Sequence, residues 1–422
     1  MASRKQPSAG VAVKRSRTYR GRLDFLSVFL GNILASASGL IVGLLLAKGL
    51  EPEGRGLLAI ALTWSGLALN FLGFGLRNAS AYFTASDATN RGAWYSSALV
   101  LSASSTGLIY IVGFSFIFLT VVDLALRDAL VIAFLATPFA QLAGISRGAL
   151  QSIDLVKWSV VKFVQPMAYF MAVMSLYTTD SLTVRCAAGA YFASLVLAAI
   201  VAWLAVRSTH TFRREGCTFA RLRSVFGYGM RSTLTSSAQV VNVRLDVAVL
   251  GIMLSHQEVG IYAVAASLAL YVVPLSTAAA PWVFPRIARE KNLGDSQSEA
   301  RRALLVSAGM AIGFAGIAAV LGPIAIDWIL GEEWLPSIVP MWILLVAAVF
   351  QAIRFVQVSI ANALNRPELG GYAEISAAIV TLIALWPAVT FFGINGAAVT
   401  TLLAALTSAT LLAVSLSRAF SS

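Results

Sequence analysis

The chain has 422 residues, of which 58% are hydrophobic and only 12% are charged, and its mean hydropathy is +0.81. Soluble domains carry about a quarter charged residues, so this composition excludes a soluble enzyme and a disordered chain. The net charge of +12 would suggest nucleic-acid binding in a soluble protein, whereas in a membrane protein Lys and Arg collect on one side of the bilayer. The positions of the basic residues decide between these two interpretations.

Hydrophobic segments long enough to cross a bilayer recur along the whole chain. A transmembrane helix needs about 20 consecutive apolar residues with few charges, and the sequence contains twelve such segments joined by short connections. Gly and Pro within them are tolerated because neighbouring membrane helices can satisfy the freed backbone groups. In chain order, the twelve predicted spans cover residues 23–48, 57–75, 93–120, 129–146, 158–178, 184–206, 229–254, 261–285, 303–326, 337–360, 372–391 and 397–417.

These spans predict an all-α, polytopic membrane protein organised in two six-helix halves. The predicted organisation is a basic tail at 1–22, a first half at 23–206, a linker at 207–228, a second half at 229–417 and a short tail at 418–422.

Basic residues are distributed unevenly between the two sides of this predicted topology. Twenty-three lie in the tails and the even-numbered connections, and only four, Lys48, Arg55, Arg127 and Arg185, lie on the other side. Lys and Arg concentrate on the cytoplasmic side of membrane proteins, so both termini are predicted to be cytoplasmic. Because this asymmetry accounts for the net charge, nucleic acid is not an expected partner.

The sequence contains no pattern that is typical of a metal or redox site. The two cysteines and two histidines do not occur in CxxC or HxxxH spacing, which Cys/His metal sites usually show. Cys186 and Cys217 fall on opposite sides of the predicted membrane, so they cannot form a disulfide. No metal and no cofactor is therefore expected.

Two similarities within the chain indicate that the halves are repeats. GLEPEGRGLLAIA after the first span and LSHQEVGIYAVAA after the seventh align Gly56 with Gly260, an offset of 204 residues. After spans four and ten, residues 149–151 (ALQ) align with 363–365 (ALN) at an offset of 214. Since six is an even number of spans, we expect parallel repeats about an axis along the membrane normal, with a central cavity between them.

Four segments of the chain are distinctive as a set. They are GLEPEGRG after the first span, FGLRNASAYF after the second, RGALQ after the fourth and LDVAVLGIMLSHQEVGIYAVA across the seventh. Together they resemble the bacterial polysaccharide flippases of the multidrug/oligosaccharidyl-lipid/polysaccharide exporter superfamily, over roughly residues 20–415. The twelve predicted spans lack the two further C-terminal helices of lipid II flippases, which makes a peptidoglycan precursor a less favoured cargo.

This resemblance implies a function in surface polysaccharide assembly. It implies a transporter, not an enzyme, that moves undecaprenyl-diphosphate-linked oligosaccharide units across the bacterial inner membrane for O-antigen, capsule or exopolysaccharide. The partners that it implies are the lipid-linked glycan, membrane lipids, a polysaccharide polymerase and glycosyltransferases.

Arg244 is the charged residue that the sequence places deepest in the membrane. It stands about fifteen residues into the seventh span, where a charge costs at least a few kcal/mol unless it has a partner or lines water. A guanidinium binds phosphate oxygens in bidentate geometry and stays protonated, so Arg244 is predicted to line the cavity and contact the diphosphate. The alternative is an ion pair with an acid on another helix, because Asp246 at i+2 points to nearly the opposite side.

Other polar residues within the spans are further candidates. Arg354 either lines the cavity or extends to the cytoplasmic surface, and Arg77 is expected at the inner mouth. Asp246 and Asp24 are the acids expected within spans and are candidate carriers of a coupling proton or sodium ion, or Asp246 simply neutralises an arginine. Three further residues are candidates for hydrogen bonds to sugar hydroxyls or, alternatively, to neighbouring helices: Gln239, Asn242 and Gln351.

Two other functions compete with a flippase. A drug/cation antiporter of the same superfamily would need acids in its cavity, whereas the deep charges here are mainly arginines. A membrane enzyme of polysaccharide assembly is less favoured because no connection exceeds about 25 residues and no DxD pair occurs.

Overall fold

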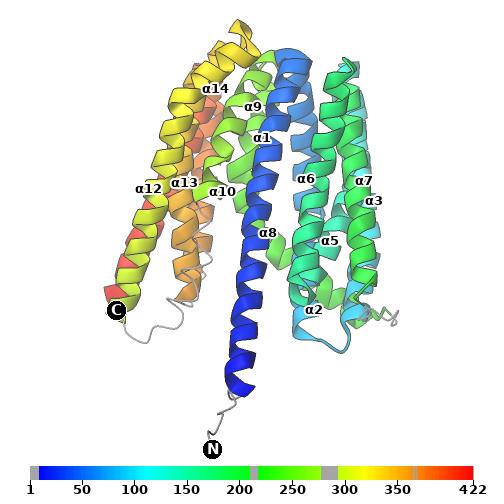
Figure 1. Ribbon diagram of the computed structural model, residues 1–422. Helices are drawn as coiled ribbons and strands as arrows, with labels where there is room; N and C mark the ends of the chain where they lie inside the picture. The colour runs from blue at the N-terminus through cyan, green and yellow to red at the C-terminus, as the bar shows by residue number, and fades with distance from the viewer. Residues whose placement is uncertain (1–8, 210–216, 277–292, 365, 367, 422) are drawn as a thin grey trace, which may run out of the picture.

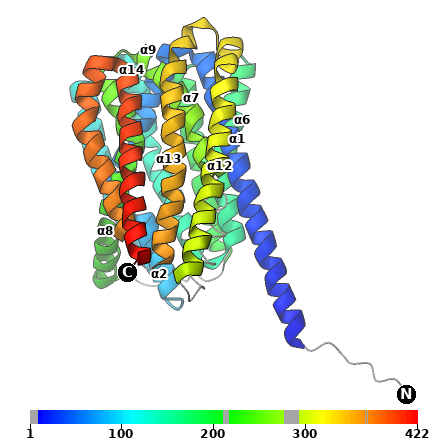
Figure 2. The same cartoon turned by 90° about the vertical axis from the view of Figure 1, so that its left-hand side faces the viewer.

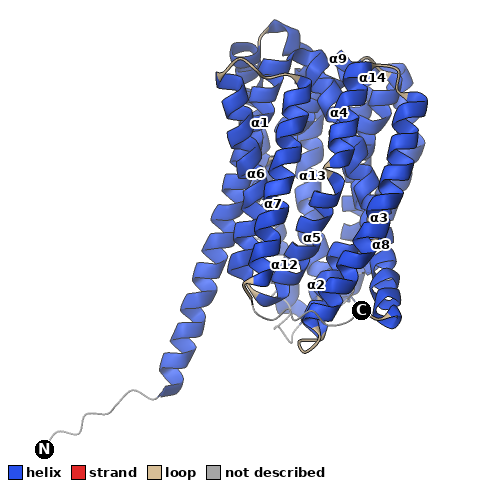
Figure 3. Cartoon of the chain, turned by 90° about the vertical axis from the view of Figure 1, so that its right-hand side faces the viewer, coloured by secondary structure: helices blue, strands red, loops and turns tan. Residues whose placement is uncertain are grey.

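The computed structural model describes the backbone of residues 9–209, 217–276, 293–364, 366 and 368–421. Side chains are described for the same residues except 9–36, 234–236, 275, 293–296 and 421. This part of the chain is helical and contains no β-strand (Figure 3). The all-α prediction is confirmed.

The helices follow one another with short connections. In chain order they are α1 (Ala9–Leu72), α2 (Leu76–Ser86), α3 (Arg91–Thr120), α4 (Leu124–Leu135), α5 (Thr137–Ile153), α6 (Leu155–Thr178), α7 (Val184–Arg207), α8 (Phe219–Met253), α9 (His256–Leu270), α10 (Val272–Ser276), α12 (Leu293–Ala325), the π-helix η2 (Ile326–Leu330), the 3-10 helix η3 (Glu332–Ser337), α13 (Ile338–Ala363) and α14 (Glu368–Ser421).

Two of these helices turn back on themselves. In α1 the turn falls at Glu51, whose φ is 55°, and the next residue is Pro52, which cannot continue the preceding hydrogen-bond ladder. In α14 the turn falls at Gly393, where φ is also 55°. Figure 1 shows α1 rising from its N-terminal end and its second limb returning beside it.

The number of membrane crossings agrees with the sequence. Nine helices of the described residues are long and apolar enough to cross a membrane, and α8, bent by 54° between Thr233 and Ser237, provides a tenth span. With both limbs of α1 and α14 counted, the described part of the chain makes twelve crossings. The end of the predicted span 261–285 and parts of the predicted loops, at 210–216 and 277–292, lie outside the described residues.

The crossings form two bundles that meet along α1 and α9. Figure 1 places α12, α13 and α14 on one side of the molecule, and α3, α5, α6 and α7 on the other. In Figure 2, which is seen from the first side, α12, α13 and α14 lie in front. The start of α1 and the end of α14 lie at the same end of the bundle, which we call the terminal end, and the opposite end is the far end (Figure 1). The chain is thus a multi-pass membrane protein with a seam between two helical bundles.

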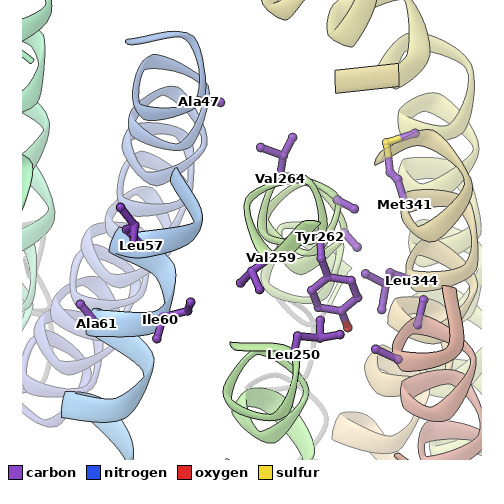
Figure 4. Packing of buried hydrophobic residues seen from close by; sticks show 14 of the residues in the cluster. Ala47, Leu57, Ile60, Ala61, Leu250, Val259, Tyr262, Val264, Met341 and Leu344 are labelled. Atoms are coloured by element: carbon purple, nitrogen blue, oxygen red, sulfur yellow. The ribbon is translucent and has the colours of Figure 1, made fainter. Parts of the chain in front are cut away.

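A hydrophobic cluster closes this seam towards the far end. Leu57, Ile60 and Ala61 of α1 belong to the same buried cluster as Val259 and Tyr262 of α9, and Figure 4 shows them on facing helices. Helix α9 begins at a capping box in which Ser255 and Glu258 bond each other's backbone N–H groups. The cap fixes the start of the helix that packs against α1.

The closest approach in the seam is between two glycines. A Cβ atom added to Gly56 would lie 2.8 Å from the carbonyl carbon of His256 and 2.9 Å from the nitrogen of Gly260, and it would overlap the His256 oxygen. A Cβ added to Gly260 would likewise overlap the carbonyl oxygen of Pro52. Only residues without a side chain allow the two backbones to touch in this way.

A side-chain contact joins the two bundles at the far end as well. The Asp123 Oδ1 atom accepts hydrogen bonds from the Ala125 and Leu126 N–H groups and so caps α4. Its Oδ2 atom lies 3.6 Å from Nδ1 of His256 at the start of α9. The far end is therefore held shut by both backbone packing and an ionisable pair.

Candidate substrate cavity

A cationic cavity lies between the bundles on the terminal side of the glycine contact. It has a volume of about 630 Å³ and is lined by α1, α2, α5, α7 and α8. Three arginines, Arg77, Arg147 and Arg244, lie among its described lining residues, and none of those residues is a carboxylate. The cavity wall therefore has an uncompensated positive charge.

The backbone places Arg77 and Arg147 close together. Arg77 stands in the first turn of α2, directly after a tight turn in which Phe74 and Gly75 both have positive φ. Helix α5 packs so near that a Cβ on Gly148 would overlap the Arg77 carbonyl oxygen. Both arginines line the same cavity, and the Arg147 Nε atom donates to the Ala143 carbonyl at 3.4 Å. Such a pair favours an anion between its members.

Arg244 is shared between this cavity and a smaller one. It lines both spaces, and its side chain is exposed although it lies within a membrane-crossing segment. No carboxylate of the described residues lies within ion-pair distance of it. Asp246 instead accepts a hydrogen bond from the Tyr262 hydroxyl at 2.5 Å and one from the Val247 N–H at 2.7 Å. Among the described side chains, Arg244 has no partner acid, and its predicted contact with a diphosphate stays a prediction.

The smaller cavity has a volume of about 200 Å³ and extends from Arg244 towards the glycine contact. It is lined by α1, α8, α9, α13 and α14, so it lies between the two bundles. Arg55 is part of its wall and is only 8% exposed. The positive-inside count had placed Arg55 in an aqueous connection, whereas the turn at Glu51 puts it in the first helical turn of the returning limb, facing inwards.

Arg354 and Asn242 belong to a neutral cluster in the second bundle, which reaches the wall of the smaller cavity through Asn242. The Arg354 Nη1 atom lies 2.6 Å from Oε2 of Glu374. The Asn242 side-chain amide donates to the same carboxylate oxygen at 3.1 Å, and its oxygen accepts from Thr381 at 3.4 Å. Arg354 is therefore balanced by an acid from the next span, which distinguishes it from the cavity arginines.

The remaining candidates are dispersed. Gln239 lines the larger cavity, and Gln351 lines the smaller one. Asp24 lies in the first limb of α1, where the structure describes the helix but not the side chain. In the part of the chain that the structure describes, no group of three or more His, Cys, Asp or Glu side chains could hold a metal ion.

Three residues of these sites were not among the sequence candidates: Arg55, Arg147 and Glu374. Arg55 and Arg147 had been counted as loop charges, and Glu374 lies so near the start of its predicted span that it does not stand out as an intramembrane acid. The one available signal was the glycine spacing around Arg147, since Gly144 and Gly148 mark the face on which another helix approaches closely.

Two bundles of membrane-crossing helices around a cationic cavity define the protein, by its fold, as a polytopic all-helical membrane protein. The sequence pattern of the family described as polysaccharide biosynthesis protein matches residues 23–291, which is more than half of the chain. The chain belongs to this family.

Known relatives agree with this assignment. The probable low-salt glycan biosynthesis flippase Agl15 of Haloferax volcanii is 27% identical over 190 residues, which cover 44% of this chain and 40% of the relative. The chain therefore matches only about two fifths of the length of that archaeal protein.

Solved structures show the same fold. The lipid II flippase MurJ in an inward closed conformation gives a TM-score of 0.77 at 14% identity, covering 93% of this chain and 87% of that one. An inward-facing multidrug resistance transporter of the MATE family gives 0.73 at 14% identity, covering 92% and 94%.

Proposed function

We propose that the protein is a flippase that moves undecaprenyl-diphosphate-linked oligosaccharide units across the bacterial inner membrane during surface polysaccharide assembly. The observation that carries this proposal is the larger cavity, where Arg77, Arg147 and Arg244 face the interior without a carboxylate among the described lining residues. A diphosphate headgroup has at least two negative charges, and forked guanidinium donors match its oxygens.

The geometry suggests how the headgroup crosses. The 23 basic residues counted at the tails and even-numbered connections support a cytoplasmic terminal end. In this conformation the seam is shut at the far end by Gly56 and Gly260. On the terminal side α2 and α8 touch at Gly75 and Gly229, and in the proposed cycle they separate to admit the headgroup from the cytoplasm. The headgroup exchanges water for arginine contacts and leaves when the far end of the seam opens, while the polyprenyl tail stays in the lipid.

Membrane lipids surround the protein in this proposal, and glycosyltransferases and a polysaccharide polymerase supply and consume its cargo. The protein itself binds and moves the substrate without chemical change. Asp246 is a candidate carrier of the coupling ion because it is 8% exposed and lies in the wall of the smaller cavity. Asp24 is retained as a second candidate.

A drug/cation antiporter is the alternative, and it has the likeness to a MATE-family transporter in its favour. A cationic drug would meet three arginines in the larger cavity, and their repulsion is costly in a low-dielectric site. The charge of the cavity therefore favours an anionic cargo.

Substitutions at Arg244 test the proposal. In a strain without its own polysaccharide flippase, Arg244→Ala should abolish complementation while membrane expression stays near wild type, because no ion pair is broken. Arg244→Lys should restore part of the activity, since an ammonium attracts phosphate but lacks the fork. Arg302→Ala, which removes an exposed charge from α12 outside the cavity, is the matched control and should complement fully.

Full complementation by a well-expressed Arg244→Ala protein would reject the proposed role of the cavity. Loss of cationic-dye efflux in the same variant, without loss of polysaccharide, would instead support the antiporter.

A further inference from the structure

The smaller cavity contains a buried cation that the proposed function does not yet use. Arg55 is 8% exposed, and its Nε atom has no hydrogen-bond partner. Among the described residues, its side chain makes one hydrogen bond, a long one of 3.4 Å from Nη2 to the Ser267 hydroxyl. A buried guanidinium usually pairs with a carboxylate, and none of the described residues provides one within 4.0 Å of Arg55.

The groups around Arg55 are hydroxyls. Ser267 lies on α9 and accepts the long hydrogen bond from Arg55, and Tyr169 of α6 and Tyr271 after the end of α9 lie near Arg55 but outside the lining of the cavity. The Tyr169 hydroxyl is itself buried without a partner. Guanidinium and hydroxyl donors around a small space are the groups that bind phosphate oxygens.

Among the described lining residues, the one acid of this cavity is already engaged. Asp246 lines the same space but accepts hydrogen bonds from Tyr262 and Val247. The described wall therefore has two cations, Arg55 and Arg244, against one hydrogen-bonded carboxylate. Its net charge suits an anion.

The volume limits which part of a substrate fits. At about 200 Å³, the cavity is smaller than the roughly 300–1,000 Å³ of sites for drug-sized ligands, so a chain of sugars does not fit. A diphosphate-sized group does, and Arg244 connects this space with the larger cavity.

We propose that Arg55 and Arg244 together form a second, deeper binding site for the diphosphate of a polyprenyl-linked substrate, with Arg55 as its contact nearest the far end. This inference rests on the proposed function and adds a residue to it. Arg55 precedes Gly56 in the chain, so the site lies directly beside the contact that must separate for release. An anion that has passed Arg77 and Arg147 reaches Arg55 last.

Binding to the full-length protein in phosphatidylcholine nanodiscs tests the site. The probes are farnesyl diphosphate, farnesyl monophosphate and inorganic pyrophosphate, and the readout is the dissociation constant from intrinsic tryptophan fluorescence. Arg55→Gln keeps polar atoms near Ser267 but removes the charge, and it should weaken farnesyl diphosphate binding by about tenfold or more, as expected for a lost charge-assisted hydrogen bond. Arg55→Lys should lie between this variant and wild type.

If Arg55 has only a structural role, different results are expected. The effect of Arg55→Gln should be smaller for the monophosphate than for the diphosphate if Arg55 binds the second phosphate, whereas a packing defect would weaken both equally. Arg185→Gln removes an exposed charge from the start of α7 and should leave all three affinities unchanged. Size-exclusion chromatography confirms that the variants are folded, and Arg55→Lys provides the test if Arg55→Gln is not.

The possible outcomes distinguish the Arg55 site from the proposed flippase function. Normal binding by Arg55→Gln, with binding lost in Arg244→Gln, would overturn the Arg55 site and leave the proposed function standing. Failure of the wild-type protein to bind any probe would overturn both. Arg55-dependent binding of pyrophosphate as tight as that of farnesyl diphosphate would support an anion site but overturn its assignment to a lipid headgroup.

Discussion

Replacing Gly56 by alanine should hold the far end of the seam open. The new Cβ would lie 2.8 Å from the His256 carbonyl carbon and 2.9 Å from the Gly260 nitrogen, and it would overlap the His256 oxygen. These are backbone atoms, so no side-chain rotation relieves the contact, and the two helices must separate. Overpacking of this kind costs about 1–3 kcal/mol. Because the cost applies only while the seam is closed, the ratio of the closed to the open population should fall about 5- to 150-fold.

Thiol labelling from the outside measures this shift. Cys186 and Cys217 are first replaced by serine, and Ala266, which lines the smaller cavity, is replaced by cysteine. Gly56→Ala should then raise the rate at which a membrane-impermeant maleimide reacts with this cysteine, by a factor within that range. Gly260→Ala should have the same effect, and the double variant should add little because one separation relieves both contacts.

The control is Gly107→Ala in α3, where an added Cβ meets no atom within 4 Å. It should leave the labelling rate unchanged. Wild-type labelling of a folded Gly56→Ala protein would refute the view that this glycine contact closes the cavity.

Three further expectations follow from the contacts. Arg354→Ala should lower the melting temperature and the expression level, because an unpaired buried partner costs about 3–5 kcal/mol. Arg354→Gln combined with Glu374→Gln should recover much of the loss. Equal melting temperatures of the Arg354→Ala and Arg244→Ala proteins would contradict the ion-pair assignment. His256→Ala should speed labelling of the cavity cysteine by at most about fivefold, since the partly exposed contact between His256 and Asp123 is worth up to about 1 kcal/mol, and a larger increase would contradict this assignment. In intact cells, a cysteine at position 257 should react with an impermeant reagent while one at position 215 is protected, and the reverse pattern would invert the proposed orientation.

The sequence was sufficient to predict the crossings and their class. Each span is a long apolar run, and hydrophobicity alone determines whether such a run enters a bilayer. The turns within α1 and α14 did not obscure this result, because Glu51-Pro52 and Gly393 lie between predicted spans. Hydropathy does not show in which direction a polar side chain faces within the bundle.

The interior charges show this limit. Arg77 and Arg147 lie near cytoplasmic span ends, where the positive-inside rule already accounts for an arginine, and Arg55 lies near a span end on the opposite side. Only the packed helices show that all three line cavities. Arg354 and Glu374 are 20 residues apart on successive spans, so their pairing depends on helix rotation and register. By contrast, the sequence identifies Arg244 as a cavity candidate, because the residue lies too deep in its span for its side chain to reach the lipid headgroups easily.

The contact between Gly56 and Gly260 connects the repeat in the sequence with the mechanism. The offset of 204 residues that aligns these glycines also aligns Pro52 with His256. The structure shows a reciprocal arrangement, in which Gly56 lies against His256 and Gly260 lies against Pro52. Contacts of residue i with j and of j with i are characteristic of a two-fold relation, and equivalent residues touch each other only near the axis. An axis along the membrane normal between parallel repeats therefore passes close to these glycines. Because the cavities lie along the same seam, separation of the bundles at this contact changes access to both arginine sites at once.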